Sequence, residues 1–252
     1  MPLVHTIVDS DEYVRPLLRE AFRKDAHGLS QAELLAFLAS TIWPHSDGEA
    51  RVVSIVGGAG GGKSTLARRL IACLQAQGLA AETISTDDYV LGDRTWRWQH
   101  FEGELVRDPR GKYDFAHLHH KINAIRKNRS AEHFIKVPTY DAASGRAIDV
   151  GEENYRRAIG KLDVLVVEGD VEIGAPDLTI YLHLADRHRL QNRIARDQVE
   201  RGVPDPKRIA ANFALRQRNQ HFPYTLPAIS KADIVVHAQP HGEWRYDTYR
   251  AK

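Results

Sequence analysis

The fold is decided by the stretch RVVSIVGGAGGGKSTLARRL, residues 51–70, where a β-branched run leads into glycines and then into a helical pattern. Within it, Gly57, Gly62, Lys63 and Ser64 satisfy the pattern G-x-x-x-x-G-K-[ST]. The pattern is informative here because a strand enters it and a helix leaves it. The glycines allow the backbone to curl so that several N–H groups point inward, and the helix directs its positive end to the same place. The sequence therefore predicts a phosphate-binding loop.

The loop is expected to hold a nucleoside triphosphate, with ATP as the donor. Lys63 would reach the β- and γ-phosphates, and the Ser64 hydroxyl would ligate Mg²⁺. The residues assigned to the nucleotide in this segment are Gly57, Gly58, Ala59, Gly60, Gly61, Gly62, Lys63, Ser64 and Thr65. Binding alone leaves open whether the protein transfers the phosphoryl group, hydrolyses the nucleotide or signals with it.

Strand and helix patterns alternate over the remainder of the chain. The run LDVLVVEG, residues 162–169, is apolar at successive positions, which is typical of a strand buried on both faces of a parallel sheet. Alternating strands and helices predict an α/β fold, a three-layer sandwich with a mostly parallel sheet between helices. The expected strands are residues 51–57, 82–87, 162–169, 178–184 and 232–238.

Residues 1–48 are interpreted as a small helical extension that is separate from the nucleotide-binding domain, residues 49–252. Ser30 and Glu33 form a capping-box pattern, and Leu34 and Leu38 follow on one helix face. We expect this extension to be a packing appendage.

Composition restricts the class of protein. The chain has 252 residues, 42% apolar and 27% charged, and a net charge of +2, so no broad electrostatic case for nucleic-acid binding follows. The single cysteine, Cys73, excludes a disulfide framework and a cysteine-based zinc site. The N-terminus has no signal-peptide pattern, and no apolar stretch approaches the ~18 residues that span a bilayer. We expect a cytoplasmic protein whose partner is a small hydroxyl compound, with its oligomeric state left open.

Carboxylates are expected at the sheet edge that carries the phosphate-binding loop. Asp87 ends a strand and would face the γ-phosphate from the acceptor side, as the base that takes the proton of a substrate hydroxyl. Asp88 is expected to form a turn or an N-cap instead. Glu168 ends another strand, where an acid would hold Mg²⁺; the alternative is that this strand reaches solvent there.

Arginines follow the strand at residues 178–184. Arg189, Arg193 and Arg196 are spaced i, i+4, i+7 on one helix face, and Arg201 comes soon after. Such arginines would stabilise the charge of the transferring phosphoryl group, on a mobile lid at roughly residues 186–204 that excludes water. The alternative is a solvated helix face.

Seven segments in this order resemble the uridine kinase / phosphoribulokinase / pantothenate kinase family. They lie between residues 51 and 237 and read GGAGGGKSTLARRL, ISTDDYV, GKYDF, VPTYDAASGR, VVEGD, RIARDQVERG and KADIVV. The resemblance implies a P-loop kinase that uses ATP and Mg²⁺ to phosphorylate a small hydroxyl compound.

The resemblance also implies roles for particular residues. Asp87 falls on the catalytic base of the family and Glu168 on its Mg²⁺-associated acid. The lid arginines fall on Arg193 and Arg196, which we assign to catalysis with Lys63, and on Arg201, which we assign to ATP. The residues assigned to the substrate are Asp87 and its neighbour Tyr89, Asp108 near a ribose-binding aspartate, Tyr140 of a nucleoside pocket, Trp96, and Arg146.

The chain departs from uridine kinases where those proteins read the pyrimidine. The histidine that they carry shortly after the tyrosine is replaced by the run AASGR, residues 142–146, so that Arg146 could suit an anionic substrate. Trp96 could stack on a flat ligand or pack locally. The best single acceptor is a uridine- or cytidine-like nucleoside, with a sugar, a pantothenate-like acid or another metabolite open. The rival from another class is a regulatory P-loop ATPase without an acceptor.

Overall fold

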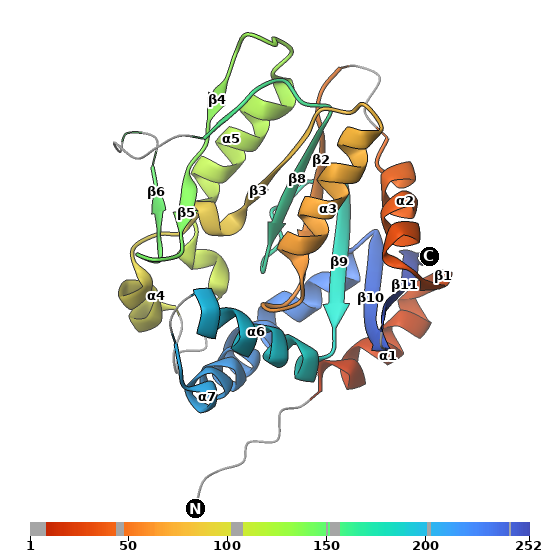
Figure 1. Cartoon of the computed structure of the whole chain (residues 1–252), viewed down its shortest axis with the longest axis vertical. Coiled ribbons are helices and arrows are strands. Elements are labelled where there is room, and N and C mark those ends of the chain that lie inside the picture. Colours follow the sequence, from red (N-terminus) through yellow and green to blue (C-terminus); the bar gives the residue numbers. More distant parts are fainter. Residues whose placement is uncertain are drawn as a thin grey trace, which may run out of the picture.

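A seven-stranded sheet forms the centre of the structure (Figure 1). The computed structural model describes residues 9–43, 48–101, 108–149, 151, 157–200, 203–241 and 243–252. Across the sheet the strands are β1 (Phe22–Leu29), β11 (Glu243–Ala251), β10 (Ile234–His241), β9 (Leu178–Leu184), β2 (Arg51–Val56), β8 (Val164–Gly169) and β3 (Ala81–Ser85). The five strands from β10 to β3 are parallel, and β11 is antiparallel to both of its neighbours. The mostly parallel sheet and α/β class are as predicted.

Helices cover both faces of this sheet. The longer ones are α1 (Ser10–Ala21), α2 (Gln31–Thr41), α3 (Lys63–Ala76), α4 (Arg94–His100), α5 (Phe115–Lys127), α6 (Asp186–Glu200) and α7 (Pro206–Arg216). Short 3₁₀ or π-helical segments span Thr86–Tyr89, Pro109–Lys112, Gln217–Thr225 and Leu226–Lys231. Two small antiparallel pairs, β4 (Ile135–Lys136) with β7 (Ala158–Ile159) and β5 (Thr139–Asp141) with β6 (Arg146–Ile148), lie beside the main sheet.

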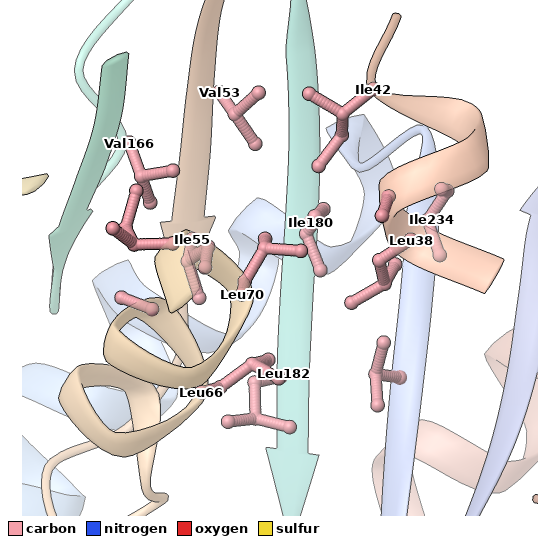
Figure 2. Close-up of a cluster of buried hydrophobic side chains, with 14 of the residues drawn as sticks. Leu38, Ile42, Val53, Ile55, Leu66, Leu70, Val166, Ile180, Leu182 and Ile234 are labelled. Carbon is pink, nitrogen blue, oxygen red and sulfur yellow. The ribbon is translucent and has the colours of Figure 1, made fainter. Parts of the chain in front are cut away.

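The strand period of two divides the core into layers. Val53 and Ile55 of β2 pack on one face against α2 and α3, through side chains such as Leu38 and Leu70 (Figure 2). Val52 of β2 points to the opposite face, which is covered by α5. A third cluster joins α1 to the segment Leu226–Lys231. These layers make the three-layer sandwich.

The N-terminal segment differs from the helical extension that the sequence predicts. Residues Phe22–Leu29 form the edge strand β1, paired with β11, so the segment is a strand between two helices. Leu34 and Leu38 of α2 are fully buried in the same cluster as β2. The pattern did not reveal β1 because Phe22 is its only buried side chain, and its pairing depends on backbone hydrogen bonds. The division of the chain at residue 48 stays a prediction.

Local signals at helix ends are reproduced. The side chain of Ser30 accepts from the Glu33 N–H, and the Glu33 carboxylate accepts from the Ser30 N–H, which completes the capping box of α2. Within the described part of the chain, every helix is too short or too polar to cross a bilayer.

Candidate active site

The loop between β2 and α3 packs tightly against α6. Gly60 has a φ of 81°, and a Cβ there would lie 2.4 Å from the carbonyl oxygen of Arg189. A Cβ at Gly58 would lie 2.1 Å from Cζ of the same arginine. A larger residue is therefore excluded at Gly60, and at Gly58 it would displace the Arg189 guanidinium. The loop backbone is held where its N–H groups precede the N-terminus of α3.

Arg189 of α6 contacts this loop and helps to hold it in place. Its buried guanidinium donates to the Ala59 carbonyl oxygen at 3.1 Å, to Asp186 Oδ1 at 2.9 Å and to Gln217 Oε1 at 2.8 Å. This face of α6 is thus packed into the protein at Arg189, not solvated. The arginine acts on the position of the loop.

Lys63, the first residue of α3, forms an ion pair with a carboxylate that the sequence analysis did not single out. Its side chain is 7% exposed, and its Nζ donates to Asp170 Oδ1 at 2.7 Å and to the Gly58 carbonyl oxygen at 3.2 Å. Burial alone would raise the pKa of Asp170, but the charges of Lys63 and Lys112 hold it well below its usual range. The sequence feature that could have indicated Asp170 is its position as the second acid of VVEGD, directly after β8.

Ser64 and Glu168 bring two oxygen donors together beside the loop. The Ser64 hydroxyl donates to Glu168 Oε1 at 3.1 Å. Glu168 is only 9% exposed, so β8 does not simply reach solvent there. Burial raises the pKa of Glu168, and the charge of Lys63 opposes that rise. A hydroxyl and a carboxylate are the hard oxygen ligands that Mg²⁺ prefers, so these residues fit that ion.

The two adjacent aspartates after β3 face different environments. Asp88 is buried, accepts from the N–H groups of Ser85 at 2.9 Å and Tyr140 at 2.8 Å, and pairs with Arg157. The N-cap of the segment Thr86–Tyr89 is Ser85, not Asp88; Asp88 is the third residue of the segment and completes the capping box by accepting from the Ser85 N–H. Asp87 is exposed and lines the cavity in front of the loop, where the Tyr113 hydroxyl lies 3.4 Å from its Oδ1.

This cavity has a volume of about 870 Å³ and opens at the carboxyl ends of β2, β3 and β8. A site of this size suits a nucleotide and a small acceptor. The chain brings together around it Lys63, Ser64, Asp87, Glu168, Arg193 and Arg196.

Arg193 and Arg196 reach the cavity from α6. Both arginines bond the carboxylate of Asp197. Nε and Nη2 of Arg196 lie 3.0 and 2.9 Å from Asp197 Oδ1, and Nη2 of Arg193 lies 3.5 Å from Asp197 Oδ2. A triphosphate in the cavity would compete with Asp197 for these guanidinium groups.

The other predicted site residues are distributed differently. Residues Ala59 to Thr65 and Tyr140 line the cavity, whereas Gly57 and Gly58 are not among its lining residues. Four described residues assigned to the substrate are not among the lining residues: Tyr89, Trp96, Asp108 and Arg146. Arg201 lies outside the described residues. All of these assignments stay predictions.

The local contacts of three of these residues are structural. Trp96 stacks on His100 with ring centroids 4.7 Å apart. Asp108 pairs with Arg110 and accepts from its N–H. Tyr89 is buried with its ring edge against His117.

Two arginines of α4 line the cavity near Asp87 and Tyr140, and the sequence analysis missed both. Arg97 is 5% exposed and donates to the carbonyl oxygens of Gly92 at 2.8 Å and Gly145 at 2.6 Å. Arg94 donates to the Ala142 carbonyl oxygen at 2.9 Å. Within the described ranges neither guanidinium forms an ion pair with a carboxylate. The sequence feature that could have indicated them is the pair of arginines in RTWRW, residues 94–98, where only a tryptophan was assigned to the substrate.

Comparisons with known proteins agree with this geometry. Residues 52–243 match the model of the Phosphoribulokinase / Uridine kinase family. A uridine kinase of Limosilactobacillus reuteri is 23% identical over 199 residues, covering 73% of this chain and 82% of that protein. A uridine kinase of Halobacterium salinarum is 26% identical over 196 residues, covering 73% and 78%. The solved D-glycerate 3-kinase of Cryptococcus neoformans superposes with a TM-score of 0.60 at 15% identity, covering 82% of this chain and 94% of that one, which shows a shared fold.

Proposed function

Because the chain belongs to the Phosphoribulokinase / Uridine kinase family, we propose that it is an ATP-dependent kinase for the hydroxyl group of a small molecule. The observation that carries the proposal is the position of Asp87. Its exposed carboxylate lines the same cavity as Lys63 and Ser64 of the phosphate-binding loop. A phosphoryl acceptor between them would meet a base on one side and the triphosphate on the other.

Each residue then has a defined task. The loop and Lys63 hold the phosphates, with Lys63 exchanging the carboxylate of Asp170 for phosphate oxygens. Arg193 and Arg196 neutralise charge on the transferring group, and Asp87 orients the acceptor hydroxyl and takes its proton. Ser64 and Glu168 would hold Mg²⁺, which when bound screens the charge of the phosphate oxygens. Arg201 would contribute to ATP binding.

Two acceptor classes have support. The named activity of the curated relatives favours a uridine- or cytidine-like nucleoside, for which Asp108, Tyr89, Trp96 and Tyr140 are the proposed contacts. The α4 arginines favour an acceptor with an acidic group, such as a pantothenate-like acid. Arg97 carries a nearly buried charge whose hydrogen bonds, among the described residues, go to neutral carbonyl oxygens, and a buried charge is costly unless an opposite charge accompanies it. An anionic acceptor would supply that charge, and we favour this class.

The test is ADP release from ATP and Mg²⁺ with a panel of nucleosides, sugars and hydroxy acids. We expect a hydroxy acid to raise ADP release well above the acceptor-free rate, with a phosphorylated product. ADP release that no acceptor changes would favour the regulatory ATPase. Release that responds to RNA or DNA and falls steeply with salt would favour a nucleic-acid-processing ATPase.

Arg94→Gln tests the acidic acceptor class directly. This change removes the charge and keeps much of the side-chain length. A hydrogen bond to a charged group contributes about 1.5–3 kcal/mol, so the KM for the acidic acceptor should rise by about 10-fold or more while the KM for ATP changes little. Arg129→Gln, on the exposed segment after α5, is the control and should leave both KM values unchanged. An unchanged KM for the acid in Arg94→Gln would contradict the assignment.

A further inference from the structure

Three side chains that the phosphoryl-transfer site does not use converge at the start of α1. His183 of β9 and His237 of β10 occupy paired positions in the parallel register. Asp11, in the first turn of α1, faces both: His183 Nε2 lies 2.6 Å and His237 Nε2 3.9 Å from its Oδ1. The two imidazole rings have centroids 5.1 Å apart.

Hydrogen bonding explains only part of this cluster. The distance between His183 and Asp11 is that of a hydrogen bond, but 3.9 Å is too long for one. The side chain of His237, whose residue is 8% exposed, has no hydrogen bond in the portion of the chain that the structure describes. Its ring nitrogens are not among the fully enclosed atoms that lack a partner, so a ligand from solvent can reach them.

The charge states suit metal coordination. Burial and the neighbouring His183 lower the pKa of His237 to about 4, so its ring is neutral at pH 7 and offers a lone pair. The hydrogen bond from His183 holds the pKa of Asp11 well below its usual range, so that side chain is a carboxylate. Arg15 pairs with Oδ2 of Asp11, which leaves Oδ1 directed at the histidines. Two further charged groups act on His237: the Asp247 carboxylate, which raises its pKa, and the Arg15 guanidinium, which lowers it.

We propose that Asp11, His183 and His237 bind a divalent transition-metal ion such as Zn²⁺, with solvent as the fourth ligand. Bonds of about 2.0–2.2 Å in a tetrahedral arrangement place ligand atoms roughly 3.3 Å apart. The distances of 2.6 and 3.9 Å lie on either side of that value, and the three ligand atoms all lie within 4.8 Å of one another, so modest side-chain shifts would bring them to coordination distances. Two imidazoles and one carboxylate favour Zn²⁺ over Mg²⁺, which prefers oxygen ligands.

The position of the site indicates what the metal does. Asp11 follows Ser10, whose N–H and hydroxyl donate to Asp186 at 3.0 and 2.9 Å. Asp186 begins α6 and also pairs with Arg189, which holds the phosphate-binding loop. The ion would therefore fasten α1 to the sheet beside the base of α6, and we expect it to stabilise the fold without contacting substrate.

The experiment uses the full chain, stripped of metal, in excess Mg²⁺ and without nucleotide. Titration with Zn²⁺ should show one tight site per chain and a higher Tm, and Co²⁺ should give the visible absorption of a four-coordinate site. Changes to groups around metal ligands already weaken affinity by about 10–100-fold, so loss of a ligand in His237→Asn should weaken Zn²⁺ binding by about 100-fold or more. His120→Asn, on the exposed side of α5, is the control and should keep full affinity.

A second variant protects the test against misfolding. Asp11→Asn keeps an acceptor for His183 but removes the charge, and it should also lose the Zn²⁺-dependent rise in Tm while its circular dichroism stays native. Absence of a one-to-one site in the wild type, or equal Zn²⁺ affinity in His237→Asn, Asp11→Asn and His120→Asn, overturns the proposal. None of these readouts depends on kinase activity.

Discussion

Lys63, at the end of the phosphate-binding loop, forms an ion pair with Asp170, with Nζ and Oδ1 2.7 Å apart. A bound triphosphate would take the place of the carboxylate beside Lys63, so one anion replaces another at a largely buried cation. The exchange would be favourable because phosphate oxygens also accept hydrogen bonds from the backbone N–H groups of the loop.

Lys63→Ala should abolish phosphoryl transfer and weaken ATP binding. It removes the cation that we propose contacts the β- and γ-phosphates, and it leaves the Asp170 carboxylate without that partner, where it would repel the nucleotide. Calorimetric titration with ATP and the acceptor-dependent ADP release measure the two effects. Lys127→Ala, at the exposed end of α5, is the control. Wild-type transfer by Lys63→Ala would show that the loop is not the donor site.

Two adjacent carboxylates have different environments because the chain turns into a 3₁₀ segment at Thr86. Asp88 points inward, where three donors satisfy it, and Asp87 points into the cavity. The sequence could predict this division since a base must stay accessible and a capping carboxylate must point at backbone N–H groups.

At the scale of elements, α2 and β1 are part of the same core and sheet as the nucleotide-binding strands. β1 extends the sheet beyond β11, and α2 packs beside α3 on β9 and β10 (Figure 2). The N-terminal segment therefore contributes to the stability of the sheet that positions the loop.

Leu38→Ala should lower the free energy of unfolding by about 2–5 kcal/mol, the usual range for a fully buried leucine whose removal leaves a cavity. Chemical denaturation followed by circular dichroism measures the change. Ser40→Ala, exposed on the same helix, should change it by no more than about 0.5 kcal/mol. If Leu38→Ala unfolded with the same midpoint and slope as the wild type, α2 would not share the core.

The elements that could be predicted are those whose own residues form a recognisable pattern of apolar side chains or glycines. β2, β8, β9 and β10 are apolar runs bounded by turns, and α3 follows directly from the glycine loop. β1 and β11 could not be predicted, because β11 places charged residues in the sheet. Asp247 of β11 is buried and satisfied by the Gly28 N–H and by Lys24, contacts that only tertiary pairing creates.

The same distinction applies to the candidate site. Ser64, Asp87 and Glu168 could be placed together because strands of a parallel sheet end at one edge. Arg97 could not, since its contact with the Gly145 carbonyl oxygen joins residues 48 positions apart on α4 and the β5–β6 turn. Asp170 follows Glu168 at this same edge, but its pairing with Lys63 is visible only in the folded chain.

In the molecule as a whole, residues of the sheet edge, α4 and α6 line the same cavity as the phosphate-binding loop, Asp87 and the arginines. Most charged residues lining it are basic, whereas the chain as a whole is nearly neutral at +2. Positive charge is thus concentrated where a triphosphate and an anionic acceptor would lie, in keeping with a small-molecule site more than a nucleic-acid surface.

The proposed role of the Asp87 carboxylate is to activate an acceptor hydroxyl opposite the γ-phosphate, and the decisive experiment is Asp87→Asn measured with the best acceptor of the panel. We expect kcat to fall by roughly 10²-fold or more, the scale of general-base loss, with the Kd for ATP nearly unchanged. Glu82→Gln, exposed near the other end of β3, should keep the wild-type kcat. A wild-type kcat in Asp87→Asn would contradict the account.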